Sequence, residues 1–174
     1  MGTNRGKQFE DVIKQAFLKI PDVSIDRLHD QTNGYLGSSN ICDFIVYKKP
    51  YEYYIECKSV HGNTLSIHSN DPKKKYGNIT NKQWEGLLEK SKIKGVFAGV
   101  ICWWIDRDVT AFMPIEFLQD QRRMGRKSIQ YGLATQCEFE HNSPFEIQGK
   151  KKRVFFDYDM DDFFHKIEKQ NRRY

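Results

Sequence analysis

Two carboxylates and a lysine stand close together within residues 41–59. This stretch contains two segments rich in Ile, Val, Phe and Tyr, separated by a Lys-Lys-Pro break, and therefore predicts a β-hairpin. Side chains alternate between the faces of a strand, so Glu56 and Lys58 point the same way. The hairpin brings Asp43 of the first segment near them. Such a cluster can bind a hard divalent cation and place an amine beside its water.

The two carboxylates favour a metal because Asp43 and Glu56 would otherwise repel each other in a partly buried site. Oxygen ligands suit Mg²⁺, with Mn²⁺ as a substitute, better than zinc or copper. The backbone carbonyl of Cys57 is a third candidate ligand. Lys58 is then placed to hydrogen-bond or deprotonate the attacking water and to neutralise phosphate charge. The residues are compatible with one or two ions in each site.

An amphipathic helix over residues 6–20 is the first element expected to support this cluster. Its apolar residues recur at helical spacing, and Pro21 ends it. Glu10 lies at the edge of the apolar stripe. It is either a solvated acid near the helix N-terminus or a further ligand, for a second ion or for a metal-bound water. Residues 1–5 are expected to be a flexible arm.

A second helix is predicted over residues 80–92, with Thr80 as a favourable N-cap. Gln83 lies in the first turn of this helix, where it is either a surface residue or reaches back to the metal or the scissile phosphate. Residues 95–104 follow as a nearly continuous apolar run. That run is too short for a membrane helix and predicts a buried central strand.

The remaining elements complete an α/β pattern of a central mixed sheet flanked by helices. Residues 130–150 are expected to be irregular, and residues 165–174 are expected to form a polar tail. The other predicted elements are strands at 23–28, 109–113 and 154–156 and helices from Pro114 toward Gly125 and over 160–170. We find no repeat or linker and predict a single domain over residues 1–174.

Composition narrows the class of protein. The chain has 174 residues, 39% of them hydrophobic, which is enough for one domain with a core. No apolar run approaches a membrane span, and no apolar stretch of a signal peptide follows Arg5 and Lys7. Four cysteines without a Cys-x-x-Cys pair indicate buried thiols in a cytoplasmic protein. The histidines lack the His-x-x-x-His spacing of a zinc hydrolase.

The net charge of +5 is compatible with a polyanionic partner such as DNA. Basic residues in loops and helix ends are often only solvated, but beside an anionic site they can contact phosphates. The candidate DNA-binding residues are Arg5, Lys7, Lys73, Lys74, Lys75, Arg122, Arg123, Arg126 and Lys127.

The order of these motifs resembles the PD-(D/E)XK nuclease superfamily, and within it the RecU-type Holliday junction resolvases, including phage relatives. Asn40-Ile41-Cys42-Asp43 stands where the superfamily has proline before aspartate. The resemblance spans about residues 4–130. Its motifs in this chain are Asn4-Arg5-Gly6 before Glu10, Asp43-Phe44, Ile55-Glu56-Cys57-Lys58-Ser59, Thr80 to Gln83, Met113-Pro114 and Gly125-Arg126-Lys127-Ser128-Ile129.

The resemblance implies a restriction-endonuclease-like fold and a Mg²⁺-dependent endodeoxyribonuclease. It further implies a homodimer that cuts four-way DNA junctions, in the cytoplasm of a bacterium or of a phage-infected host. Asp43, Glu56 and Lys58 would be catalytic, with Glu10 and Gln83 assisting. Two alternatives stay open: a restriction-type or repair nuclease of the same fold acting on other DNA, and a non-catalytic DNA-binding module. We identify no segment as the stalk with which RecU proteins enter the junction.

Overall fold

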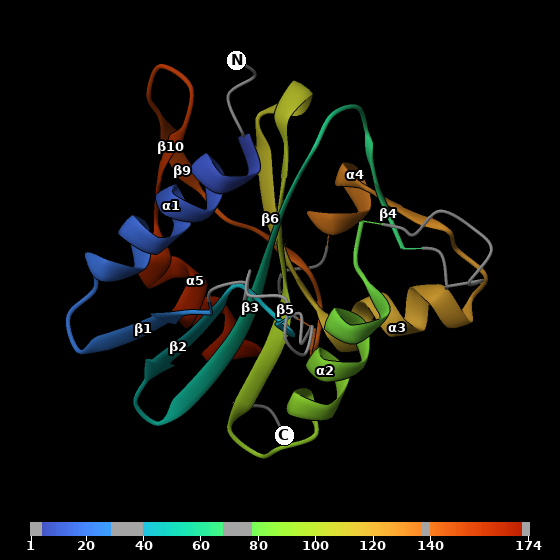
Figure 1. The fold of residues 1–174 in the computed structure, drawn as a ribbon, viewed down its shortest axis with the longest axis horizontal. Coiled ribbons are helices and arrows are strands. Elements are labelled where there is room, and N and C mark those ends of the chain that lie inside the picture. Colours follow the sequence, from blue (N-terminus) through green and yellow to red (C-terminus); the bar gives the residue numbers. More distant parts are fainter. Residues whose placement is uncertain (1–4, 29–39, 68–77, 137–139, 172–174) are drawn as a thin grey trace, which may run out of the picture.

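A mixed sheet of six strands, in the order β1-β2-β3-β5-β6-β8, forms the centre of the part of the chain that the structure describes (Figure 1). The computed structural model describes residues 5–28, 40–67, 78–136 and 140–171. The sheet strands are β1 (Val23–Arg27), β2 (Phe44–Lys48), β3 (Tyr51–Val60), β5 (Val96–Trp104), β6 (Val109–Pro114) and β8 (Phe145–Glu146). Two small pairs stand apart: β4 (Thr64–Ser66) with β7 (Ser128–Gln130), and β9 (Gly149–Lys151) with β10 (Phe156–Tyr158).

The hairpin and the central strand predicted from the sequence are both confirmed. Strands β2 and β3 pair antiparallel, with Phe44 opposite Ile55. Strand β3 pairs parallel with β5, so that Glu56 lies opposite Val100. Seven consecutive residues of β5, from Ala98 on, are buried, because the strand has neighbours on both sides and covered faces.

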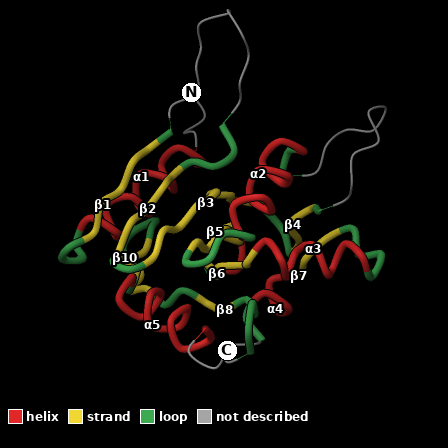
Figure 2. The backbone as a smooth tube through the Cα atoms, turned by 90° about the horizontal axis from the view of Figure 1, so that it is seen from below, coloured by secondary structure: helices red, strands yellow, loops and turns green. Residues whose placement is uncertain are grey.

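Helices cover both faces of the sheet (Figure 2). Helices α1 (Arg5–Leu18) and α5 (Met160–Asn171) pack on one face over an aromatic core that includes Phe17, Tyr53 and Phe163. Helices α2 (Asn81–Ser91), α3 (Ile115–Arg123) and α4 (Tyr131–Ala134) cover the other face, where Trp84 and Leu118 lie in a second core. A short 3-10 turn, η1 (Ile105–Arg107), joins β5 to β6. The predicted central mixed sheet flanked by helices is thus confirmed.

The sequence-based boundaries were wrong mainly in the last third of the chain. Residues 130–150 are not irregular, since they contain α4, β8 and the start of β9. The strand expected at 154–156 is observed as β10, which begins two residues later, at Phe156. The tail expected at 165–174 is largely helical, because α5 runs to Asn171 and buries Ile167. Strands of two or three residues show too little periodicity to be recognised.

The N-terminal boundary also needs correction. Helix α1 begins at Arg5, which therefore belongs to the helix and not to the predicted arm. Pro114 ends β6 and precedes α3, so it lies outside the helix it was expected to begin. Cys42, Cys57 and Cys102 are buried free thiols, as predicted. Among the described residues, no helix is long and apolar enough to cross a membrane.

Candidate active site

Glu56 and Lys58 lie on the same face of β3, as the alternation of the strand predicts. Lys58 Nζ is 2.7 Å from Glu56 Oε1. Only 2% of the Glu56 side chain is exposed, against 21% for Lys58. A carboxylate this deeply buried needs compensating contacts, and the ammonium of Lys58 supplies one of them. The pair therefore combines a buried acid with a cation that still reaches the surface.

Gln83 supplies the second contact to Glu56. Its Nε2 atom donates to Glu56 Oε1 at 2.6 Å. The other end of the same amide accepts from the Thr80 backbone N–H at 3.0 Å, and Thr80 Oγ1 accepts from the Gln83 backbone N–H. This reciprocal capping box begins α2 and fixes the direction of the amide. The start of α2 therefore orients Glu56, and Gln83 reaches back toward the candidate site, which is one of the two placements that the sequence left open.

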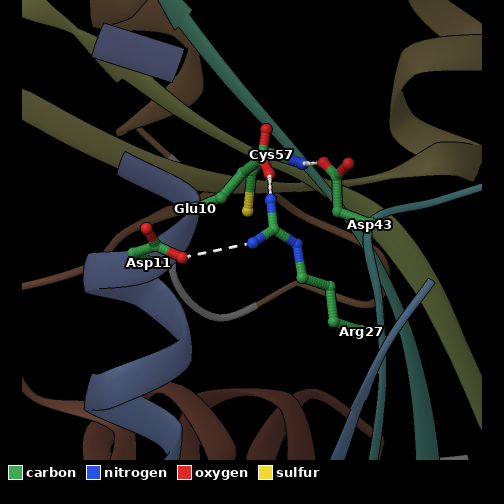
Figure 3. Close-up of polar contacts among 5 residues, drawn as sticks. All are labelled: Glu10, Asp11, Arg27, Asp43 and Cys57. Atoms are coloured by element: carbon green, nitrogen blue, oxygen red, sulfur yellow. Dashed lines mark hydrogen bonds and ion pairs between the residues drawn. The ribbon is translucent and has the colours of Figure 1, made fainter. Parts of the chain in front are cut away.

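Asp43 lies immediately before β2 and continues its hydrogen bonding. Its backbone N–H donates to Ile55, and its carbonyl accepts from Leu28. With the backbone held on both sides, the side chain points toward β3, where Asp43 Oδ2 accepts from the Cys57 N–H at 2.7 Å (Figure 3). The carboxylate of Asp43 is thus fixed beside the residue that follows Glu56.

Arg27, at the end of β1, is a member of the site that our sequence reasoning missed. Its guanidinium donates to Glu10 Oε2 and, at 3.2 Å, to Asp11 Oδ1, so it ties β1 to α1 (Figure 3). Val23 and Ile25, on the same face of β1, pack against the core beneath α1. The period of the strand places Arg27 on that face too. The alternation of side chains along β1 was therefore the feature of the sequence from which this contact could have been predicted.

The carboxylates influence one another's protonation. Burial raises the pKa of Glu56 to about 8; Lys58 acts against this shift, while Asp43 and Glu10 add to it. Burial also raises the pKa of Glu10, helped by Asp43 and opposed by Arg27. The pKa of the buried Cys57 thiol is raised well above its ordinary value, so the side chain stays an uncharged thiol. Cys57 can therefore offer a hard cation only its backbone oxygen.

The donor set fits a magnesium-like ion. Glu56 Oε2 is buried and has no hydrogen-bond partner among the described residues, which is a costly state for a carboxylate oxygen. A cation bound to this oxygen and to Asp43 would remove that cost. Within the same residues, no three His, Cys, Asp or Glu side chains form a metal-binding group. Mg²⁺ commonly uses one or two carboxylates and retains waters. The Cys57 carbonyl and Glu10 as further ligands stay predictions.

Metal binding should depend on pH through Glu56. The pKa of Glu56 is raised from 4.5 to about 8, so the metal-free folded state favours the protonated acid. The stability that this proton contributes is fully present below pH 4.5 and is lost as the pH rises through about 8. Mg²⁺ must displace the proton, so its affinity should rise up to about pH 8 and then level off. Calorimetry in buffers of different ionisation enthalpy measures the released proton. Constant affinity between about pH 6 and 8 would contradict this.

Changing Gln83 to Leu should weaken Mg²⁺ binding or cleavage about 10- to 100-fold, the usual effect of losing a group that orients a ligand. The side chain keeps its approximate volume but no longer holds Glu56. Thr80→Ala is the matched control: it removes the other half of the capping box but leaves the backbone N–H that orients Gln83. Both variants should lose about 1 kcal/mol of helix stability. Equal losses of activity in both would mean that Gln83 acts only as a cap.

The candidate DNA-binding residues do not form one cluster. Exposed Arg5 and Lys7 lie at the start of α1, whereas Arg122 and Arg123 end α3 on the opposite face of the sheet. Arg122 is used within the protein: its guanidinium lies 3.3 Å from the Trp84 ring centroid, and Nε donates to the Ile67 carbonyl. Arg123 pairs with Asp120. Both Arg126 and Lys127 are exposed, while Lys73, Lys74 and Lys75 lie outside the described residues.

Comparisons with known proteins find likenesses among solved structures. No protein-family model matches the chain, and no curated protein matches it. Among solved structures, the chain is similar to Hjc, a Holliday junction resolvase from the archaeal hyperthermophile Archaeoglobus fulgidus. The two are 19% identical, over 64% of this chain and 78% of Hjc, with a TM-score of 0.44. A likeness this distant carries no information about which reaction this chain performs.

Proposed function

We propose that this chain is a metal-dependent, structure-selective DNA endonuclease. The observation that carries the proposal is Glu56: a buried carboxylate with a lysine 2.7 Å away, a second oxygen without a described partner, and Asp43 close enough to raise its pKa. Groups arranged in this way suit a hydrolytic reaction at a phosphodiester, where a cation and an ammonium stabilise the same developing negative charge.

The residues of the chain then have separate roles. Asp43 and Glu56 would hold Mg²⁺, or Mn²⁺ in its place, and the bound ion would supply a Lewis acid and a more acidic water. Lys58 would neutralise charge on the phosphate and hydrogen-bond the attacking water. Gln83 keeps Glu56 in position through the contact at 2.6 Å. Arg27 holds Glu10 against the site, where Glu10 would hold a further water or ion.

For the substrate, we infer a four-way DNA junction cut during recombination or repair. The support is the order of sequence motifs, which resembles that of RecU-type resolvases. These motifs run from Glu10 through Asp43 and Glu56-Cys57-Lys58 to Thr80 and Gln83. A homodimer would present two such sites, one for each of two strands. Symmetric cutting of a junction needs that arrangement, because the two strands must be cut as a pair.

A panel of substrates tests the choice of DNA. A four-way junction, a linear duplex, a nicked duplex and a flap of the same sequence are incubated with protein in Mg²⁺, and the cuts are mapped on each strand. A resolvase should give paired nicks placed symmetrically near the branch point of the junction only. Equal cutting of the linear duplex would instead identify a restriction-type or repair nuclease.

A further inference from the structure

The β9–β10 hairpin carries the run Lys150, Lys151, Lys152 and Arg153, all of them exposed. Its two strands form a separate two-stranded sheet outside the main sheet (Figure 1). The turn is closed by the Lys152 N–H, which donates to the Phe155 carbonyl at 2.7 Å, so Arg153 and Val154 form its tip. With Asp157 as its one acid, the segment 149–158 has a net charge of +3.

The hairpin packs against β5 and α1. The Phe155 ring centroid lies 5.4 Å from that of Trp103, and Trp103 is the strand partner of Ser59, the residue after Lys58. On β10, the Tyr158 ring centroid lies 6.3 Å from the ring centroid of Phe9, the residue before Glu10. Phe155, Tyr158 and Trp103 belong to the core beneath α1, so the hairpin lies on the α1 side of the sheet, whereas Glu56 and Lys58 point toward α2. The basic run therefore has a fixed position near the end of β5, on the side of the sheet that carries Glu10.

Among the described residues, two of the four basic residues form ion pairs with carboxylates and two do not. Lys151 forms an ion pair with Asp108. Lys152 Nζ lies 3.7 Å from Asp157 Oδ2, and Asp157 also forms an ion pair with Lys19. Lys150 and Arg153 have no carboxylate partner among the described residues. A groove of about 510 Å³ separates the hairpin turn from α1, so the basic tip is not buried against the helix.

We propose that the β9–β10 hairpin is a DNA-binding arm, in which Lys150 and Arg153 contact backbone phosphates of the duplex whose scissile strand lies at Glu56 and Lys58. This inference rests on the proposed nuclease function. A rigid arm that reaches the same duplex from the α1 side of the sheet would set its register without reading its sequence, as phosphate contacts do. The start of α1 lies toward the same end of the molecule (Figure 1). Arg5, the exposed first residue of this helix, would extend the basic surface.

The salt dependence of binding tests the arm. Binding of a fluorescent four-way junction is measured by anisotropy without divalent metal, over a series of salt concentrations. Each lost phosphate contact lowers the slope of log K against log salt by about 0.9. The double variant K150A/R153A should therefore have a slope about 1.8 smaller in magnitude than the unchanged protein.

The matched control is K92A/K94A, which removes two exposed lysines. Both lie just before the first residue of β5, whereas Trp103 lies near the last residue of that strand. The control should retain the full slope, as should the charge-preserving K150R/R153K. Lysines on an exposed strand also protect it against pairing with other chains. If the unchanged protein binds and cuts DNA but K150A/R153A keeps the full salt slope, the proposed arm is refuted. Lys150 and Arg153 would then serve only to keep the exposed strand from pairing with other chains. If the unchanged protein does not bind DNA, the proposed function fails together with the arm.

Discussion

Replacement of Asp43 by Ala should abolish Mg²⁺-dependent cleavage while DNA binding in the absence of metal is retained. Asp43 would be one of the two carboxylates, together with Glu56, that hold the ion directly. A metal contributes several kcal/mol to stabilising the transition state, so the rate should fall by about 10³-fold or more. The measurement is the single-turnover cleavage rate of a four-way junction with saturating protein.

Asp43→Asn separates the chemical role of this residue from its structural one. The Ala variant also leaves the Cys57 N–H without the acceptor that it has at 2.7 Å, which should cost about 1–3 kcal/mol of stability. The Asn variant keeps an acceptor oxygen but loses the charge, so it should be inactive and nearly as stable as the unchanged protein. Asp26→Asn, at an exposed position on β1, is the control and should cut normally. Cleavage by Asp43→Asn at the normal rate would remove Asp43 from the metal site.

Replacement of Lys58 by Ala should have the second large effect. The ammonium lies 2.7 Å from Glu56 and is the group placed to assist the water and to stabilise phosphate charge. Loss of a positioned proton-transfer group lowers rates by about 10²–10⁴-fold. Lys58→Arg should restore little activity, because a planar guanidinium does not replace a compact ammonium. Lys94→Ala removes an exposed lysine just before the start of β5 and serves as the control.

The pH dependence of Lys58→Ala gives a second readout. Lys58 holds the pKa of Glu56 below the value that burial alone would give. Without the ammonium, that pKa should rise further, so Mg²⁺ should bind only at higher pH than in the unchanged protein. The shift is measured from calorimetric titrations at several pH values. A variant with lower cleavage but the unchanged pH dependence would mean that Lys58 acts on the substrate alone.

Local patterns in the sequence were sufficient to predict how several residues of the candidate site are placed. The period of two in β3 put Glu56 and Lys58 on one face, and the turn before Tyr51 put Asp43 opposite them. The signal at Thr80 predicted where α2 begins and put Gln83 in its first turn, where a contact with the site was one of two open placements. These features depend on neighbours within a few residues or on a single hairpin, so they can be read without knowledge of the whole fold.

Contacts between distant elements were beyond the reach of such patterns. The pairing of Arg27 with Glu10 joins β1 to α1 and becomes evident only once the two elements are packed together. Arg122 belonged to a basic run that predicted DNA contact, yet it stacks on Trp84 of another helix. A run of charges does not reveal which members are used inside the protein. The β9–β10 hairpin was missed because three-residue strands carry almost no periodic signal.

The most direct test of the central claim is cleavage of a four-way DNA junction by the unchanged protein, with Mg²⁺ and with Mg²⁺ removed by a chelator. The site built from Asp43, Glu56 and Lys58 predicts nicks near the branch point when Mg²⁺ is present, none after chelation, and recovery when Mg²⁺ or Mn²⁺ is restored. Junction binding without any Mg²⁺-dependent nick would contradict the account and would identify a non-catalytic DNA-binding module.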